Sequence, residues 1–264
     1  MLLFFDIDGT LFSNKTHRIP ASTLEAIEKA REKGHMALIN TGRTKSGMQK
    51  ELWDLPFDGY LLGCGSRIIF RGKTLYSSSF PMETGKKIIS LLNRYSLDAF
   101  LEGSDDVYVR RGDYHLAQMN RIRDEFRKAG FSSSAYIEDG NFLYDKFILI
   151  SSDPENTQKF FDDCSEWIDV IDRGAGIGPR TWECIQKGCS KANAMKILSD
   201  HLNIPLSDSA AFGDSANDLG MLQAAGHGIV MGDHSKELDC DAFFITDTVE
   251  NDGIAKAMKK LGLF

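Results

Sequence analysis

Residues 2–11 read Leu-Leu-Phe-Phe-Asp-Ile-Asp-Gly-Thr-Leu, and they determine the architecture expected for the chain. Four apolar residues in a row predict a strand that is buried on both faces, as in a parallel sheet. Asp6 and Asp8 follow at its carboxyl end, and Gly9 allows a sharp turn after them. Alternate side chains of an extended segment share a face, so the two carboxylates are expected to point the same way.

Two carboxylates on one face repel each other strongly. At about 4 Å and an effective dielectric constant near 20, the repulsion is roughly 4 kcal/mol. A proton or a cation must offset it, and Mg²⁺ prefers carboxylate and phosphate oxygens. Taken alone, the motif is also compatible with an ordinary acidic turn at the end of a strand.

The composition indicates a globular protein that acts on small molecules. Of the 264 residues, 42% are hydrophobic and 26% are charged, which is typical of soluble domains. The net charge of −7 argues against nucleic acid as a partner. No apolar run approaches the roughly 18 residues of a membrane span, and the apolar start has no basic lead, so we expect neither membrane association nor a signal peptide.

The cysteines indicate a cytoplasmic protein. There are five, an odd number, and none forms a C-x-x-C pair. We expect reduced, mostly buried thiols. We also expect the protein to be a monomer or a homodimer. The cysteines are Cys64, Cys164, Cys184, Cys189 and Cys240.

Strands and helices alternate regularly in the first and last thirds of the chain. The pattern predicts a helix between Pro20 and Gly34 and a strand over 35–40, which together with the first strand form a βαβ unit with parallel pairing. A helix over 44–53, a strand over 59–64 and a hairpin over 67–76 follow. Later segments predict helices over 190–202, 217–225, 235–238 and 251–261, and strands over 209–212, 228–231 and 242–245. The fold class expected is α/β, a Rossmann-like doubly wound parallel sheet.

The middle of the chain has a different pattern. Residues 82–187 predict helices and strands in a less regular order, which favours an inserted α+β domain with a largely antiparallel sheet. We therefore expect one domain made of residues 1–81 and 188–264, and a second made of residues 82–187. The segments predicted there are helices over 84–95, 114–129 and 156–164, and strands over 98–101, 106–110, 146–151, 168–172 and 181–185.

Three further segments carry polar residues that could serve chemistry. Gly213-Asp214-Ser215-Ala216-Asn217-Asp218 follows an apolar strand, so Asp214 would join Asp6 and Asp8 if the two strands are neighbours. By itself this segment is also compatible with a helix start that has favourable acids in its first turn. Lys191 at a helix start is unfavourable for the helix dipole, which suggests another anion nearby, although a solvated surface lysine is equally compatible. Thr41 and the Gly42 amide could hold phosphate oxygens.

These segments, in this order, resemble the four motifs of the haloacid dehalogenase (HAD) superfamily. Residues 6–10 resemble the first motif, Thr41 the second, Lys191 the third and residues 213–218 the fourth. The long gap between the second and third motifs resembles the type II-capped branch, and several later residues resemble the Cof-type, type IIB-capped sugar phosphatases. Two departures, Cys64-Gly65-Ser66 and Ala192, lie outside the predicted metal cage. The resemblance weakens in the inserted domain.

The resemblance implies a Mg²⁺-dependent phosphatase of small phosphorylated metabolites, with sugar phosphates expected. Asp6 would be the nucleophile that forms an aspartyl-phosphate, and Asp8 the general acid and base. Mg²⁺ would be held by Asp6, the Asp8 carbonyl and Asp214, with Asp218 supporting it. Thr41, Gly42, Lys191 and Asn217 would bind the phosphate, and the inserted domain would be a cap that selects the substrate.

Two other functions remain open at this point. A phosphomutase uses the same aspartyl-phosphate and would release an isomerised sugar phosphate instead of free phosphate. A non-catalytic ligand-sensing relative would show no Mg²⁺-dependent turnover. Cap residues proposed to contact substrate are Asp105, Asp106, Tyr108, Arg110, Arg111, Arg173, Arg180 and Trp182; Arg43 is a further candidate, and His115 is expected to be solvated.

Overall fold

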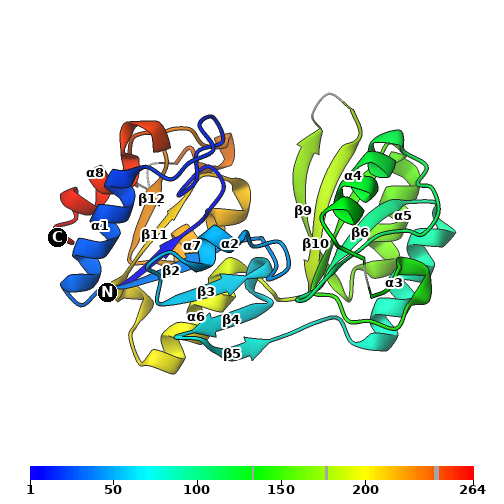
Figure 1. Cartoon of the computed structure of the whole chain (residues 1–264), viewed down its shortest axis with the longest axis horizontal. Coiled ribbons are helices and arrows are strands. Elements are labelled where there is room, and N and C mark those ends of the chain that lie inside the picture. The colour runs from blue at the N-terminus through cyan, green and yellow to red at the C-terminus, as the bar shows by residue number, and fades with distance from the viewer. Residues whose placement is uncertain (133, 176–177, 241–243) are drawn as a thin grey trace. The chain divides into compact units, whose positions relative to one another are not determined.

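The computed structural model describes residues 1–132, 134–175, 178–240 and 244–264 (Figure 1). Contacts within the chain divide it into two units. Unit 1 comprises Met1–Gly42, Gln49–Ser77 and Ser190–Phe264, and unit 2 comprises Arg43–Met48 and Ser78–Cys189. The sequence placed the boundaries at 81/82 and 187/188. It gave no indication that Arg43–Met48 would pack with the inserted part.

Unit 1 is built on an eight-stranded sheet in the order β13-β12-β11-β1-β2-β3-β4-β5. The strands from β13 to β3 pair in parallel, while β4 and β5 form an antiparallel hairpin at one edge. The fold class expected from the alternation of strands and helices is confirmed. The strands are β1 Leu2–Phe5, β2 Met36–Asn40, β3 Gly59–Leu62, β4 Arg67–Phe70, β5 Lys73–Ser77, β11 Ser209–Gly213, β12 His227–Val230 and β13 Phe244–Ile245.

Helices cover both faces of this sheet. On one face, α6 (Lys191–Leu202) and α7 (Leu219–Ala224) pack against a core that contains residues of β1, β2 and β11. A second pair of helices, α1 (Ala21–Glu32) and α8 (Gly253–Lys260), pack against each other, as Figure 1 shows. All four residues of β1 are fully buried, as the apolar run predicted.

The register of β1 decides where the acidic residues meet. Phe5 is paired with Phe212 of β11 on one side and with Ile39 of β2 on the other. The backbone amide of Asp6 donates to the carbonyl of Phe212 at 3.0 Å. The carboxyl ends of these three strands therefore lie at one edge, which is where open α/β sheets bind ligands.

Unit 2 contains a five-stranded antiparallel sheet in the order β7-β6-β8-β10-β9. Helices α3 (Met82–Arg94) and α5 (Pro154–Cys164) pack on one face, and α4 (Ala117–Lys128) packs against residues of β6 and β8 that point to the other. The strands are β6 Asp98–Glu102, β7 Val107–Tyr108, β8 Lys146–Ser151, β9 Ile168–Ala175 and β10 Arg180–Gln186.

The helix expected over residues 44–53 is wrong for most of its length. Only α2 (Lys50–Trp53) is helical. In the preceding segment, the Thr44 hydroxyl donates to Glu102 at 3.3 Å and the Ser46 hydroxyl donates to the Gly103 carbonyl at 2.7 Å. These contacts within unit 2 offset the loss of helical hydrogen bonds.

Other elements differ mainly at their ends. The segment expected as a helix over 235–238 is a single 3₁₀ turn, Lys236–Leu238, and α7 is preceded by another 3₁₀ turn, Ala216–Asp218. Part of the strand expected over 242–245 lies outside the described residues. Within the described part of the chain, no helix combines the length and the apolar character needed to cross a bilayer.

Candidate active site

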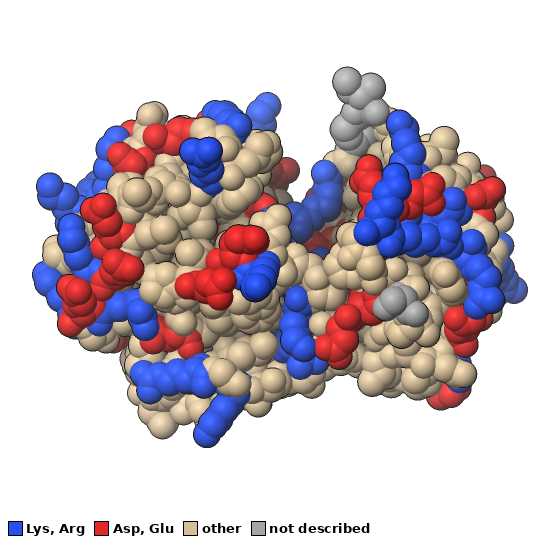
Figure 2. Space-filling model, viewed as in Figure 1, with Lys and Arg blue, Asp and Glu red and all other residues tan. Residues whose placement is uncertain are grey.

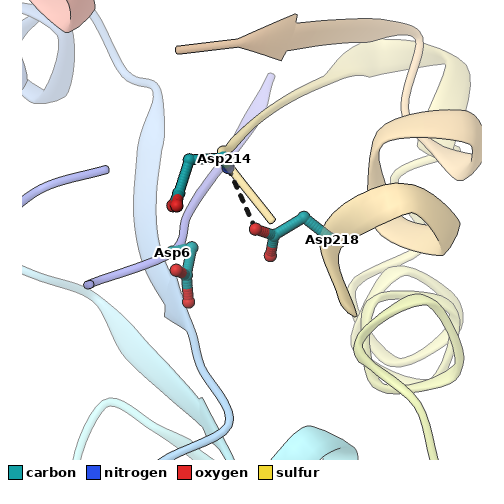
Figure 3. A group of neighbouring side chains, drawn as sticks. All are labelled: Asp6, Asp214 and Asp218. Atoms are coloured by element: carbon teal, nitrogen blue, oxygen red, sulfur yellow. Dashed lines mark hydrogen bonds between the residues drawn. The ribbon is translucent and has the colours of Figure 1, made fainter. Parts of the chain in front are cut away.

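Three carboxylates meet at the carboxyl ends of β1 and β11. Ligand oxygens of Asp6, Asp214 and Asp218 all lie within 4.8 Å of one another (Figure 3). Asp6 follows β1 directly, Asp214 follows β11, and Asp218 lies just before α7. The backbone amide of Asp214 donates to Asp218 at 3.0 Å, which closes the loop between them. The parallel pairing of β1 with β11 thus brings together residues more than 200 positions apart.

Lys191 is buried inside this group. Its ammonium donates to Asp6 at 2.6 Å and to Asp218 at 2.5 Å, and its side chain is 1% exposed. Lys191 is the first residue of α6, whose N-cap Ser190 accepts from the amide of Asn193. A solvated surface lysine, one of the two interpretations of the sequence, is therefore wrong. The helix tolerates a cation at its N-terminus because two carboxylates face it.

Asp218 also organises the loop that carries Asp214. One of its oxygens accepts from Lys191, and the other accepts from the amides of Asp214 and Ser215. A Cβ on Gly213 would lie 2.5 Å from the Asp218 Cβ, so only glycine fits the close approach. Asp218 therefore positions both the lysine and the neighbouring acid.

The charges within the cluster do not balance, because three carboxylates face one ammonium. Burial raises the pKa of Asp6 to about 8; Asp218 and Asp214 add to the rise, and Lys191 opposes it. Burial, with Asp218 adding to the effect, also raises the pKa of Asp214 to about 7. Although burial lowers the pKa of Lys191, the carboxylates of Asp218 and Asp6 outweigh it and hold this pKa above its ordinary range.

The donor set fits a hard divalent cation. Carboxylate oxygens are the ligands that Mg²⁺ prefers, and three such side chains meet here. Burial and neighbouring acids disfavour the ionised forms of Asp6 and Asp214, and a bound cation would favour them. Gly9 leaves room beside Asp214, since a Cβ at residue 9 would lie 2.5 Å from Oδ2 of Asp214. Asp6 and Asp214 are the side chains that would hold the ion, with Asp218 beside them.

Asp8 lies on the turn that follows β1, and its side chain is exposed, unlike that of Asp6. It is near enough to contribute to the raised pKa of Asp214. Thr10, two residues on, donates from its hydroxyl to Asp214 at 2.8 Å. The turn thus places Asp8 at the border of the cluster. The Asp6 carboxylate is buried, and the Asp8 carboxylate is accessible. The sequence had placed both in the same small volume.

The second motif lies at the end of β2. Thr41 is buried, its amide donates to the Leu61 carbonyl, and its own carbonyl accepts from the Cys64 amide at 3.1 Å. Asn40, which the sequence did not single out, donates from its side chain to the backbone carbonyl of Lys191 at 3.1 Å. This bond ties the end of β2 to the start of α6. Its sequence signal was a polar residue at the last position of a buried strand.

Of the remaining predicted phosphate ligands, Gly42 directly follows Thr41, and Asn217 lies in the fourth motif. The side-chain oxygen of Asn217 accepts from the Ser215 hydroxyl at 2.8 Å. This bond leaves the amide nitrogen of Asn217 available to donate.

A second buried lysine lies in unit 2, and the sequence did not single it out. Lys146 of β8 contacts Glu183 of β10 at 2.5 Å and Glu102 of β6 at 3.5 Å. Arg173 of β9 also pairs with Glu183. Burial would raise the pKa of Glu183, but Lys146 and Arg173 outweigh it and lower this pKa to about 2. Burial raises the pKa of the other carboxyl, Glu102, although Lys146 opposes the rise.

Several cap residues proposed from the sequence have structural partners inside unit 2. Asp106 is buried and accepts from the amides of Val107 and Ser132, while Tyr108 stacks on Phe142. Others form ion pairs with neighbours: Lys45 with Asp105, Arg111 with Asp139, Arg173 with Glu183 and Arg180 with Asp172.

The remaining cap candidates are more open. Trp182 lines an open pocket of about 570 Å³ within unit 2, together with the Arg180–Asp172 ion pair. Arg110 donates to the side chain of Asn93 at 2.8 Å. His115, expected to be solvated, is largely exposed but also contacts Asp98 at 2.9 Å.

Comparison with known proteins identifies the family. Residues 3–258 match the model of the haloacid dehalogenase-like hydrolases. The chain is 27% identical to the 5-amino-6-(5-phospho-D-ribitylamino)uracil phosphatase YitU of Bacillus subtilis, over 98% of this chain and 96% of that protein. It is 27% identical to the HMP-PP phosphatase of Yersinia pseudotuberculosis, over 90% of this chain and 85% of that protein.

A solved structure supports the same assignment. The HAD subclass IIB sugar phosphatase BT4131 superposes with a TM-score of 0.82 at 27% identity, and the match covers 100% of this chain and 99% of that one. The resemblance stated from the four motifs is confirmed, because the family match spans both units. The chain therefore belongs to the haloacid dehalogenase-like hydrolase family and is of its Cof type.

Proposed function

We propose that the protein is a Mg²⁺-dependent phosphatase of small phosphorylated metabolites, sugar phosphates in particular, and that it works through an aspartyl-phosphate on Asp6. The chain is a hydrolase acting on phosphate esters, in keeping with its family and its phosphatase relatives. One observation carries the proposal. Asp6 lies against Lys191 in a cluster that has more carboxylates than cations, at the ligand-binding edge of the sheet.

In the proposed reaction, an oxygen of Asp6 attacks phosphorus while the leaving alcohol departs on the opposite side. Asp8 donates a proton to that alcohol and later takes one from the water that hydrolyses the intermediate. Its exposed position suits this exchange with substrate and water. Asp6 is buried, which suits a group that must attack without competing hydration.

The remaining motif residues hold the phosphoryl oxygens. Lys191 keeps its proton, because its pKa is raised by Asp218 and Asp6, and it places a positive charge beside the nucleophile. The Thr41 hydroxyl, the Gly42 amide and the Asn217 side chain supply neutral donors. Asp6, the Asp8 carbonyl and Asp214 would hold Mg²⁺, with support from Asp218. A bound Mg²⁺ would neutralise the charge on the phosphate.

The charge of the molecule supports a small substrate. Acidic and basic side chains are interspersed on the face shown in Figure 2, and the net charge is −7, which disfavours a nucleic-acid backbone. Four of the five cysteines are buried, as we expect for thiols in a reducing compartment. We accordingly expect the enzyme to act in the cytoplasm.

Replacement of the nucleophile tests the proposal. Asp6→Asn should abolish Mg²⁺-dependent hydrolysis of p-nitrophenyl phosphate and leave the melting temperature close to that of the wild type. Asp200→Asn, which removes the exposed partner of Lys196, is the matched control and should leave turnover unchanged. Full turnover by Asp6→Asn would refute the proposal. If Asp6→Asn is inactive as expected, a screen of phosphorylated metabolites with the wild type would identify the substrate.

A further inference from the structure

The turn that carries Asp8 is closed by backbone hydrogen bonds. The amide of Phe12 donates to the Ile7 carbonyl at 2.8 Å, and the amide of Gly9 donates to the Phe12 carbonyl at 2.9 Å. Asp8 and Phe12 also form an isolated β-bridge. The position of Asp8 therefore depends on the position of Phe12. The position of Phe12 depends in turn on the contacts of the next residue, Ser13.

Ser13 is held by side-chain contacts that the proposed mechanism does not use. Its hydroxyl accepts from the amides of Lys15 at 3.1 Å and Thr16 at 2.9 Å, and it donates to a carboxylate oxygen of Glu250. Ser13 is only 1% exposed. A buried hydroxyl that donates to an ionised acceptor forms one of the stronger hydrogen bonds available to a serine.

A second contact holds the same loop from outside. The ammonium of Lys15 lies 2.5 Å from Asp233 and 3.9 Å from Glu250. Glu250 lies in the 3₁₀ turn Val249–Asn251, after β13, and Asp233 follows β12. Both acids thus come from loops at the same edge of the sheet as the three-carboxylate cluster.

The loop after β12 is itself joined to that cluster. The amide of Ser235 donates to the backbone carbonyl of Asp214 at 2.8 Å, and the amide of Gly232 donates to the Asp247 carbonyl at 3.0 Å. The three loops that follow β11, β12 and β13 are therefore linked in series. The loop that bears Asp8 is attached to the last two through Ser13 and Lys15.

We propose that Glu250 is a positioning residue for Asp8, acting through the Ser13 hydroxyl, with the Lys15–Asp233 pair as a weaker second attachment. Glu250 would fix where the general acid lies relative to the leaving alcohol without touching the substrate. Misplacement of a catalytic group by about 1 Å is enough to cost a large part of its contribution. This inference rests on the proposed function, because it assumes that Asp8 protonates the leaving group.

Leaving-group dependence separates this role from a general structural one. A general acid matters most when the departing alkoxide is strongly basic and least when it is stable without a proton. The probes are p-nitrophenyl and p-methoxyphenyl phosphate, which have similar sizes but leaving groups of different basicity. The quantity compared is kcat/KM, which reports steps through the transfer of the phosphoryl group from the ester.

In Glu250→Ala, kcat/KM for the p-methoxyphenyl ester should fall about tenfold further than kcat/KM for the p-nitrophenyl ester. Ser13→Ala should show the same selective loss, and Asp8→Asn should show it more strongly. Glu250→Gln keeps a side-chain acceptor for Ser13, so its selectivity should stay close to that of the wild type. Asp200→Ala is the control for removal of an acidic side chain elsewhere in unit 1.

Thermal unfolding of each variant, without substrate, checks that the fold is retained. An equal loss on both esters in Glu250→Ala and Ser13→Ala would overturn the inference, and so would no loss at all. If Glu250→Ala does not fold, the result for Ser13→Ala alone tests the inference. Failure of the proposed function would look different, because the wild type would then show no Mg²⁺-dependent turnover or Asp6→Asn would remain fully active.

Discussion

The two units each bury a lysine between two carboxylates, but the two clusters differ in charge. In unit 1, Lys191 lies between Asp6 and Asp218, with Asp214 beside them. In unit 2, Lys146 lies between Glu183 and Glu102. Arg173 adds a second cation there, whereas Asp214 adds a third anion in unit 1.

The pKa shifts show what this difference means. In unit 1, burial together with neighbouring acids raises the pKa of Asp6 to about 8, so its ionised form is disfavoured. In unit 2, the two cations outweigh burial and lower the pKa of Glu183 to about 2, so its ionised form is already stabilised. The excess of carboxylates in unit 1 would suit a metal ion, whereas in unit 2 two cations keep Glu183 ionised and burial still raises the pKa of Glu102.

Removal of the lysine from unit 1 should have the largest effect. Lys191→Met takes away the positive charge beside Asp6, the proposed nucleophile, and kcat/KM should fall by a factor on the order of 10²–10³. Steady-state hydrolysis of p-nitrophenyl phosphate measures it. Asp200→Asn again serves as the control. Activity within a factor of about three of the wild type would remove Lys191 from the proposed phosphate site.

Removal of the lysine from unit 2 should act on stability. Lys146→Met leaves Glu183 buried beside Glu102 with one cation fewer, and the free energy of unfolding should fall by about 3–5 kcal/mol. Urea unfolding followed by tryptophan fluorescence in a Trp53→Phe background reports on unit 2, which contains Trp167 and Trp182.

The matched control is Lys159→Met, which removes an exposed ion pair with Glu155 in the same unit. It should leave the free energy of unfolding unchanged within experimental error. Equal stabilities for Lys146→Met and Lys159→Met would contradict a structural role for the unit 2 cluster.

The contribution of Glu183 to the stability of unit 2 should depend on pH. Its folded pKa of about 2 lies below the ordinary value of 4.5, so its contribution is complete above 4.5 and is lost as pH falls towards 2. That contribution is on the order of 3 kcal/mol. The stability difference between the wild type and Glu183→Gln should be constant above about pH 5 and shrink below it. A difference that does not change with pH down to about 3 would show that Glu183 is not held ionised.

The sequence predicted part of the unit 1 cluster because the positions of these residues depend on where strands end and on which strands are neighbours. A buried apolar run predicted β1, regular alternation predicted parallel pairing, and the carboxyl ends of neighbouring strands then had to meet. This rule brings Asp6 and Asp214 together once β1 and β11 are neighbours, a condition that the sequence left open. The sequence placed Asp8 as the third carboxylate, whereas the structure places Asp218 there. Asn40 was missed because its role depends on the start of α6, 151 residues away.

The same reasoning could not predict the unit 2 cluster. Lys146 and Glu183 are single charges inside strands, and they meet only because of the antiparallel register in which Glu183 pairs with Ile148. Register depends on contacts that are distant in the sequence, and a shift of one residue would move Glu183 to the other face. The helix expected over 44–53 was wrong over residues 44–49 for a related reason, since the partners of Thr44 and Ser46 lie 58 and 57 residues away in the sequence.

Binding of Mg²⁺, measured by titration calorimetry without substrate, tests the difference between the two clusters most directly. The wild type and Glu183→Gln should each bind one ion with similar affinity. Asp214→Asn, which lowers the carboxylate excess in unit 1, should bind none measurably. Binding to Asp214→Asn with wild-type affinity would contradict the proposal that the excess negative charge of unit 1 would hold Mg²⁺.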